Sequence, residues 1–399
     1  MATREVWIVD ALRTPVGRHG GALAGVRPDD LAAHVLKSLT DKTQIPLADI
    51  EDVYLGCVNQ AGEDNRNVAR MSLLLAGFPE QVGGCTVNRL CGSGLEAVAC
   101  AARSIMAGEG HVYLAGGVES MSRAPLVVAK AERLFSINHQ TMYDSTIGWR
   151  FINPRMEAMG YTDSMGRTAE NLAAQYRISR EAQDLFALAS QQKAVKAQEA
   201  GVFNAEIVAV PIKSGLFEID EGPRKETTLE KLTSLKPVFK RDGTVTAGNA
   251  SMINDGAAVL LLVSREYAMT HGLNPLARVR SIAIAGTAPQ IMGIGPVQAT
   301  EKALSRAVVT LNDIGLIELN EAFAAQSLAV LAEWQMDYQD PRLNPNGGAI
   351  ALGHPLGCTG AKLLTSLVYE MQRREQAELG LVSLCIGVGQ GISMVVEKV

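Results

Sequence analysis

Cys91 has the residue type and the surroundings that nucleophilic chemistry needs. It lies in the run 87–94, directly ahead of a strongly helix-forming stretch, so its thiol is expected at the N-terminus of a helix. Unpaired N–H groups and the positive end of the helix dipole favour a thiolate there and predict a lowered pKa for Cys91. The alternative is a small buried apolar side chain, which free cysteines often are.

His354 and Cys385 lie among glycines near the C-terminus. His354 precedes Pro355 in the run 346–357, which predicts a rigid loop rather than a helix or strand interior. A general base would be placed on such a loop, although a single histidine is equally expected as a surface or core residue. Cys385 closes an apolar run at the predicted C-terminal end of a buried strand, the edge where α/β proteins place their sites.

Three further residues border predicted loops and could contribute to the same site. Asn320 follows the predicted strand 316–319, where it could cap a helix or position a water or an oxyanion. Met165 and Met292 could each face either a substrate chain or the core.

Apolar periodicity predicts alternating strands and helices at both ends of the chain. The first part has predicted strands at 5–9, 52–56, 111–115 and 257–264, with helices at 28–40, 66–76 and 95–106. The last part has predicted strands at 276–285, 316–319 and 380–385, with helices at 296–308, 322–334 and 361–374. The matching order indicates a duplicated α/β unit, with two unrelated α/β domains as the alternative.

Between these parts, residues 122–245 break the alternation and predict an inserted segment, whose end at 220–241 is expected to be largely exposed loop. The predicted division is therefore a first half formed by 1–121 plus 246–270, an insert at 122–245 and a second half at 271–399.

Composition excludes several classes of protein. The 399 residues include 37 Lys and Arg against 42 Asp and Glu, a net charge of −5, and the basic residues are scattered, which argues against nucleic-acid binding. The longest apolar run, 257–263, is too short to span a membrane, and no signal peptide is recognisable. A cytoplasmic protein without a membrane partner is therefore expected. The six cysteines form no C-x-x-C pair, which disfavours disulfides and a metal site.

Taken together, these motifs make the sequence similar to the thiolases over nearly its full length. The matching blocks are residues 87–94, 116–122, 248–257, 320–324, 344–360 and 385–391. The resemblance implies an α/β thiolase fold, in which two duplicated βαβαβαββ halves stack as five α-β-α-β-α layers with an inserted loop domain. It also implies CoA binding and oligomerisation through the insert, in a homodimer or a homotetramer that is a dimer of dimers.

The resemblance implies a role for each candidate catalytic residue. Cys91 matches the nucleophile that carries the acyl group, His354 the base that takes its proton, and Cys385 the cysteine that moves a proton at the α-carbon of acetyl-CoA. Asn320 matches the residue that holds a water beside the His354 imidazole, which together form an oxyanion hole for the enolate. The backbone amides of Cys91 and Gly387 match a second oxyanion hole at the acyl-enzyme.

Binding residues follow in the same way. Ser251 and Arg224 resemble CoA-contacting positions, and the resemblance favours an acyl chain as the substrate group that Met165 and Met292 could face. Biosynthetic thiolases resemble His-Met-Gly where this chain has 164–166, so a strictly acetyl-specific enzyme is disfavoured. Residues 146–154 are similar to a stretch of 3-oxoadipyl-CoA thiolases, and Arg150 within it could pair with a distal carboxylate or form an ordinary salt bridge.

The expected activity is cleavage of 3-ketoacyl-CoA with CoA to acetyl-CoA and a shortened acyl-CoA, through an acyl-enzyme on Cys91, with acetoacetyl-CoA also accepted. This corresponds to a thiolase of the β-oxidation type. CoA is a substrate in this reaction, which needs no metal or other cofactor. The alternatives are an acetyl-CoA C-acetyltransferase, a 3-oxoadipyl-CoA thiolase and a non-catalytic acyl-CoA carrier. A decarboxylating ketosynthase is disfavoured because Cys385 would have no role in it.

Overall fold

The N-terminal part of the chain folds around a mixed sheet. The computed structural model describes residues 4–131, 133–135, 137 and 139–399. The sheet has the strand order β1 (Val6–Arg13), β10 (Asn254–Ser264), β5 (Val112–Ser120), β3 (Asp52–Gly56) and β4 (Gly83–Val87). β10 is antiparallel to β1 and β5, whereas β3 is parallel to β5 and β4. Helices α1 (Pro28–Thr43) and α2 (Val68–Leu75) pack on one face and α3 (Ser93–Ala107) on the other.

The C-terminal part repeats this plan strand by strand. Its sheet has the order β11 (Ala277–Gly286), β14 (Gln390–Lys398), β13 (Leu379–Ile386) and β12 (Leu316–Leu319). Beyond β12, Leu343 bridges Ile317 in parallel, at the position that β4 has in the first sheet. Helices α9 (Gly295–Ala307) and α10 (Ala324–Trp334) cover the outer face, and α12 (Leu356–Arg373) lies inside. Both parts therefore follow the βαβαβαββ order that the resemblance implied, with the Leu343 bridge in place of the third strand in the second part.

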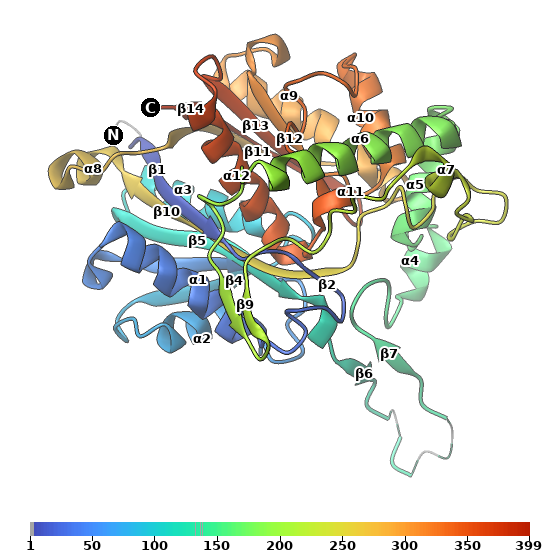
Figure 1. The fold of residues 1–399 in the computed structure, drawn as a ribbon. Coiled ribbons are helices and arrows are strands. Elements are labelled where there is room, and N and C mark those ends of the chain that lie inside the picture. Colours follow the sequence, from blue (N-terminus) through green and yellow to red (C-terminus); the bar gives the residue numbers. More distant parts are fainter. Residues whose placement is uncertain (1–3, 132, 136, 138) are drawn as a thin grey trace.

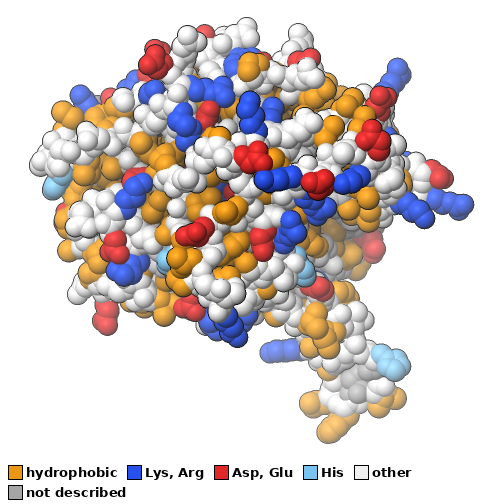
Figure 2. Space-filling view, in the orientation of Figure 1, with side chains coloured by type: hydrophobic (Ala, Val, Ile, Leu, Met, Phe, Trp, Pro, Cys, Tyr) orange, Lys and Arg blue, Asp and Glu red, His pale blue; other side chains and the backbone are white. Residues whose placement is uncertain are grey.

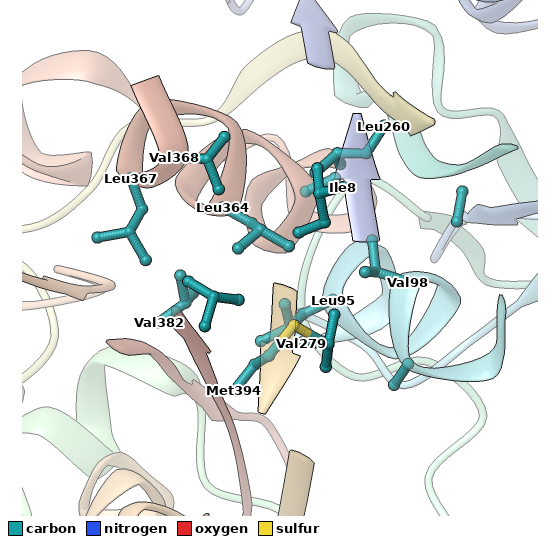
Figure 3. Packing of buried hydrophobic residues seen from close by; sticks show 14 of the residues in the cluster. Ile8, Leu95, Val98, Leu260, Val279, Leu364, Leu367, Val368, Val382 and Met394 are labelled. Carbon is teal, nitrogen blue, oxygen red and sulfur yellow. The ribbon is translucent and has the colours of Figure 1, made fainter. Parts of the chain in front are cut away.

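The two sheets join at one edge and enclose a central helical layer (Figure 1). β1 pairs with β11 through Trp7↔Arg278 and Ile8↔Ala277, which makes the two sheets one continuous ten-stranded sheet within the described residues. α3 and α12 lie between the two sheets, and their apolar side chains meet those of both inner faces (Figure 3). Leu95 and Leu364 are fully buried there. The layers are therefore α-β-α-β-α, as the resemblance implied.

Glycines set the distance between the two central helices. A Cβ atom at Gly94 of α3 would lie 2.7 Å from the carbonyl oxygen of Gly357, at the start of α12. A Cβ atom at Gly360 of α12 would lie 2.5 Å from the backbone nitrogen of Leu95. Because both obstacles are backbone atoms, no side-chain rotation could relieve the clash, so the helices cross backbone against backbone.

The sequence predicted no segment long and apolar enough to span a membrane, and the central helix α3 tests that expectation. The segment Leu90–Ala107 is long and apolar enough to do so by length and composition alone, contrary to that expectation. In the structure, however, the same residues pack against α12 and the two sheets. Its hydropathy is accounted for by its place in the core.

The segment between β5 and β10 extends from the body and then returns across it (Figure 1). Strands β6 (Leu126–Val128) and β7 (Met142–Asp144) form a hairpin that projects outward. The remaining elements of the segment are α4 (Pro154–Ala158), α5 (Met165–Gln175), α6 (Arg180–Glu199), β8 (Val210–Ile212), β9 (Gly215–Phe217) and α7 (Leu229–Thr233). The segment begins with the 3-10 helix η2 (Met121–Arg123), and outside it lie β2 (Gly17–Arg18), α8 (Arg265–His271), α11 (Ala349–Leu352) and the 3-10 helices η1 (Leu47–Asp49), η3 (Pro289–Ile294) and η4 (Leu311–Asp313).

A buried ion-pair network attaches this segment to the core. Arg13, at the end of β1 and fully buried, pairs with Glu206 at 2.6 Å and with Asp220 at 2.8 Å. Asp220 also accepts the N–H of Val16 at 2.7 Å. The prediction of a largely exposed loop at 220–241 was therefore wrong at Asp220, which is buried because Arg13 needs its carboxylate.

The sequence did not predict β14, because the glycines at 387–391 obscured a strand that begins among them. The three residues between β13 and β14 make a tight turn, with positive φ angles of 63° at Val388 and 82° at Gly389. This turn reverses the chain directly after Cys385, so β14 pairs back along β13 and presents Gly391 opposite Cys385.

We predict that Gly360→Ala destabilises the fold although alanine is the better helix former. The added methyl would overlap the α3 backbone, and overpacking of this kind typically costs about 1–3 kcal/mol. Differential scanning calorimetry should show a lower unfolding midpoint than wild type. Gly25→Ala is the control, since no atom lies within 4 Å of its added Cβ. An unchanged or raised midpoint for Gly360→Ala would contradict the backbone contact.

Candidate functional site

Cys91 lies on a strained turn that leads into the central helix α3. Leu90, the residue before it, has a left-handed φ of 46°, a conformation that costs a non-glycine residue about 1–3 kcal/mol. Ser93 holds this turn, because its Oγ accepts the N–H of Arg89 at 2.9 Å and donates to the Leu90 carbonyl at 2.6 Å. Gly92 packs against Ile386 and Ile392 so closely that a Cβ there would lie 2.7 Å from the Ile386 side chain. The thiol is thus fixed against the end of β13.

The turn between β13 and β14 brings Gly387 and Cys385 to Cys91. The N–H of Gly387 donates to the Cys91 sulfur. Burial and, secondarily, the neighbouring Cys91 raise the pKa of Cys385. A Cβ at Gly387 would lie 3.5 Å from the sulfur of Met165. Two cysteines and one bare backbone amide therefore meet at this point, as the sequence predicted.

His354 enters the site from the loop before α12. Its backbone N–H donates to Asn254 Oδ1 at 2.9 Å, and Asn254 Nδ2 donates to the Gly17 carbonyl at 2.9 Å. The preceding Gly353 has a positive φ of 98°, and a Cβ there would lie 2.6 Å from the Asn254 side chain. The backbone of His354 is thus held by the first half of the fold, although His354 belongs to the second.

Thr359 determines which imidazole nitrogen of His354 is basic. The Thr359 hydroxyl donates to the Pro355 carbonyl at 2.7 Å, and its oxygen lies 2.7 Å from His354 Nδ1. Since its one proton is already used, the hydroxyl can only accept from Nδ1, which must carry the hydrogen. Nε2 is then the nitrogen with the free lone pair, and it faces Asn320 Nδ2 at 3.5 Å.

Asn320 is not a helix cap, which was one of its two interpretations. Helix α10 begins only at Ala324, with Phe323 as its N-cap and without a side-chain cap. The Asn320 side chain is fully buried, and its Oδ1 has no hydrogen-bond partner among the residues that the structure describes. An amide that is buried beside a basic nitrogen and has a free oxygen can hold a small polar group between itself and His354.

Glu119 joins the two halves of the site. Its buried carboxylate accepts three backbone N–H groups, from Val58 and Asn59 at 3.0 Å each and from Gly357 at 2.8 Å. Val58 and Asn59 follow β3, whereas Gly357 follows His354. Burial raises the pKa of Glu119 to about 7, although the three donors act in the opposite direction. Glu119 thereby fixes the His354 loop against the half that carries Cys91.

The predicted CoA-binding residues lie together on one side of the site. Ser251 donates its backbone N–H to the carbonyl of Ala322 at 3.0 Å, which places it beside the loop after Asn320. The Arg224 guanidinium lies 3.8 Å from the sulfur of Met252, the residue next to Ser251. Arg224 is exposed, so its charge is available to solvent on this side.

The two predicted methionines lie beside Cys385. Met292 and Cys385 belong to one buried cluster, and Met165 packs against it. The other members of the cluster are all apolar, namely Ala169, Ala173, Val245, Ala250, Ala322, Phe323 and Ala325. Met165 and Met292 thus border the position of Cys385, on α5 and η3, and can contact a group held at the cysteines.

Electrostatics in the site differ from the expectation of a thiolate. Burial raises the pKa of Cys91 to about 11, and the N–H groups of Gly387 and of Cys91 itself offset this only in part. Burial and, secondarily, the Lys362 charge lower the pKa of His354 to about 3. The prediction of a lowered Cys91 pKa was therefore wrong, because the loss of hydration outweighs the helix N-terminus. At neutral pH the site holds a thiol and a neutral imidazole.

Sequence reasoning missed three residues that hold the site in place. Glu119, Asn254 and Thr359 all lie within the matching blocks but had no assigned function. For Thr359 a signal existed, because it lies one helical turn after Pro355, in reach of the His354 ring. For Glu119 and Asn254 the partners are distant in sequence, which only the fold could reveal.

Known proteins resemble the chain over its full length. Residues 6–266 match the family model "Thiolase, N-terminal domain", and residues 273–398 match "Thiolase, C-terminal domain". A Pseudomonas putida beta-ketoadipyl-CoA thiolase is 55% identical over 401 residues, which cover 99% of this chain and all of the relative. An Escherichia coli K12 3-oxoadipyl-CoA/3-oxo-5,6-dehydrosuberyl-CoA thiolase is 54% identical over 402 residues, with 99% of this chain and 100% of the relative covered.

A solved structure also resembles this chain over its full length. The crystal structure of a Bacillus anthracis acetyl-CoA acetyltransferase is 42% identical, with a TM-score of 0.94 and complete coverage of both chains. This agreement confirms the predicted fold class, including the paired halves and the central helices.

We predict that alkylation of Cys91 by iodoacetamide accelerates with pH and does not level off near neutrality. With a pKa of about 11, the thiolate fraction should rise about tenfold per pH unit and still be rising at about pH 9.5. Mass spectrometry of the Cys91 peptide would give the rate at each pH, with the exposed Cys85 as an internal reference. A plateau below about pH 8 would instead indicate a resting thiolate.

Proposed function

The chain belongs to the thiolase family and is an acyltransferase, and we propose that it cleaves 3-oxoadipyl-CoA, with CoA as the second substrate, to acetyl-CoA and succinyl-CoA. The observation that carries the choice of substrate is the level of identity to the named relatives. Relatives from Escherichia coli and Pseudomonas putida that are 54% and 55% identical carry the name beta-ketoadipyl-CoA thiolase. The sequence similarity at 146–154 supports the same substrate, which ranked only as an alternative in the sequence analysis.

The proposed first step is attack of the Cys91 sulfur on the C3 ketone of the substrate. His354 Nε2 takes the thiol proton as the carbon–sulfur bond forms, since neither group is ionised beforehand. The C2–C3 bond then breaks, which leaves a succinyl thioester on Cys91 and the enolate of acetyl-CoA. Cys385 gives its proton to the enolate carbon, and acetyl-CoA departs.

In the proposed second step, the thiol of free CoA attacks the succinyl thioester. The CoA proton passes to the Cys385 thiolate left by the first step, and the Cys91 sulfur leaves and regains its proton from the His354 imidazolium. Succinyl-CoA is released, and the resting thiol and imidazole are restored. Thioester exchange between sulfurs is close to balanced in energy, which makes a cysteine a suitable carrier in both steps.

Fixed hydrogen-bond donors would stabilise the negative charge in each step. The N–H groups of Cys91 and Gly387 hydrogen-bond the Cys91 sulfur and would donate to the oxygen of an acyl group carried there. Asn320, with its unpaired oxygen beside His354, can hold a water toward the enolate oxygen. Donors that are already in place cost no reorganisation when charge develops. CoA enters this scheme as a substrate, and the chemistry requires neither a metal nor a redox cofactor.

The CoA part of the substrate would lie on the side of Ser251 and Arg224. Arg224 is exposed and cationic, which suits a phosphate of CoA, and Ser251 lies between it and the Asn320 loop. Cleavage of neutral 3-ketoacyl-CoA esters, including acetoacetyl-CoA, is a second candidate activity, because the side of Met165 and Met292 is apolar.

We propose that the protein assembles as a homodimer or as a homotetramer built from two dimers. The support lies in the β6–β7 hairpin, which projects from the body and carries hydrophobic side chains (Figure 2). Leu126 and Met142 in its strands are 62% and 63% exposed, and Leu134 and Phe135 near its tip are 90% and 95% exposed. Apolar side chains exposed to this extent on one hairpin are typical of an interaction surface.

The test of the proposed function is a comparison of kcat/KM for 3-oxoadipyl-CoA and 3-oxohexanoyl-CoA, which differ only in a terminal carboxylate. We expect a preference of about 10- to 100-fold for the dicarboxylic substrate, since a charge-assisted hydrogen bond is typically of this strength. Mass spectrometry of the quenched enzyme should show a succinyl adduct on Cys91. Absence of both the preference and the adduct would rule out this substrate.

We further predict that Thr359→Val lowers kcat about 10- to 100-fold with little change in KM. Valine has nearly the same shape as threonine but cannot accept the Nδ1 hydrogen, so the imidazole loses the contact that fixes its tautomer and orientation. Thr359→Ser restores the hydroxyl and should retain most of the activity in the same steady-state assay. Equal losses in the two variants would mean that Thr359 acts only through packing.

A further inference from the structure

The proposed substrate carries a charge that the apolar side of the site does not balance. The side chains packed around Cys385, which include Met292 and Phe323, are apolar. A carboxylate placed against such a wall loses its hydration without gaining a partner, which is strongly unfavourable. A dicarboxylic acyl group therefore requires a cationic side chain at the far end of its chain.

Arg150 differs from the other partly buried arginines of the described chain in having no partner. Every other described arginine that is at least partly buried donates to a carboxylate or a carbonyl, as Arg89 does to the Gln390 side chain and Arg123 to Glu63. Arg150 is also partly buried, yet it makes no hydrogen bond or ion pair with any other residue that the structure describes. The ordinary salt bridge that the sequence left open is therefore not seen within those residues.

Two aromatic neighbours fix the backbone on either side of Arg150. The Trp149 indole N–H donates to the carbonyl of Asp163 at 3.1 Å. The Phe151 ring meets the Tyr143 ring edge to face at a centroid distance of 5.0 Å, and Phe151 has a left-handed φ of 52°. Because the backbone is held on both sides of Arg150, its guanidinium extends from a defined position.

The same loop is tied to the elements that border the cysteines. Asn171 of α5 donates to the Asp163 carboxylate at 2.9 Å and to the carbonyl of Gln290 in η3 at 3.0 Å. α5 begins with Met165, beside Gly387, and η3 carries Met292. Trp149 is thus connected through Asp163 to both elements that carry the methionines beside Cys385.

We propose that the guanidinium of Arg150 binds the distal carboxylate of a dicarboxylic acyl group and so determines substrate specificity. This inference rests on the proposed function. A planar guanidinium can donate two parallel hydrogen bonds to a carboxylate, a geometry that an aliphatic chain end cannot use. The contact forms in both the Michaelis complex and the succinyl-enzyme, because the distal carboxylate stays with the acyl group throughout.

The experiment compares Arg150→Met with wild type on 3-oxoadipyl-CoA and 3-oxohexanoyl-CoA. We expect Arg150→Met to lose about 10- to 100-fold in kcat/KM for 3-oxoadipyl-CoA and to stay within about twofold of wild type for 3-oxohexanoyl-CoA. Arg150→Lys keeps the charge but loses the paired donors, so it should fall between the two. Arg155→Met is the matched control, because Arg155 is exposed and lies on the neighbouring helix α4. This variant should leave kcat/KM for both substrates unchanged.

Each other outcome contradicts a different statement. If wild type shows no preference for 3-oxoadipyl-CoA, the proposed function fails, and this inference fails with it. If wild type prefers 3-oxoadipyl-CoA and Arg150→Met keeps that preference, only the role of Arg150 is wrong. An equal loss on both substrates would show that Arg150 supports the loop rather than the carboxylate.

Discussion

The contact on which the site depends is the crossing of α3 and α12 in the middle of the molecule. Gly94 and Gly360 allow the two helices to meet backbone against backbone. Cys91 lies just before the N-cap of α3 and His354 just before the N-cap of α12, so the distance between the helices also sets the distance between the proposed nucleophile and the proposed base. The strands and outer helices bury the sides of this pair, and Glu119 ties the loop of one helix to the half that carries the other.

Near this crossing, the side chains of Cys91 and His354 are neutral, whereas the buried charged side chains form a separate network. Cys91 and His354 are uncharged near neutral pH, because burial shifts their pKa values in opposite directions away from 7. Arg13, Glu206 and Asp220 form a buried network that attaches the inserted segment to the core. The site therefore resembles an apolar cavity with a few fixed donors. Such a setting strengthens the hydrogen bonds to a developing oxyanion, since water does not screen them.

Local patterns predicted the parts of this arrangement that local forces determine. The strands at 52–56 and 316–319 have the predicted bounds, and Cys91 and His354 were recognisable from the glycines and the proline around them. The sequence could not show that Asn320 lies before α10 and does not cap it, because that depends on how Asn320 packs beside His354. The burial of Asp220 depends on Arg13, more than 200 residues away. The Cys91 pKa was predicted in the wrong direction because hydration loss depends on the whole surrounding fold.

The pairing of β1 with β10 has a consequence for how the chain is made. β1 comprises residues 6–13, but its sheet neighbours β10 and β11 begin only at residues 254 and 277. At typical synthesis rates the ribosome adds the intervening residues in roughly 10–50 s, during which β1 has no strand to pair with. Such high contact order delays folding and leaves an apolar strand open to wrong partners. The nascent chain should therefore depend on chaperones until most of its length has emerged.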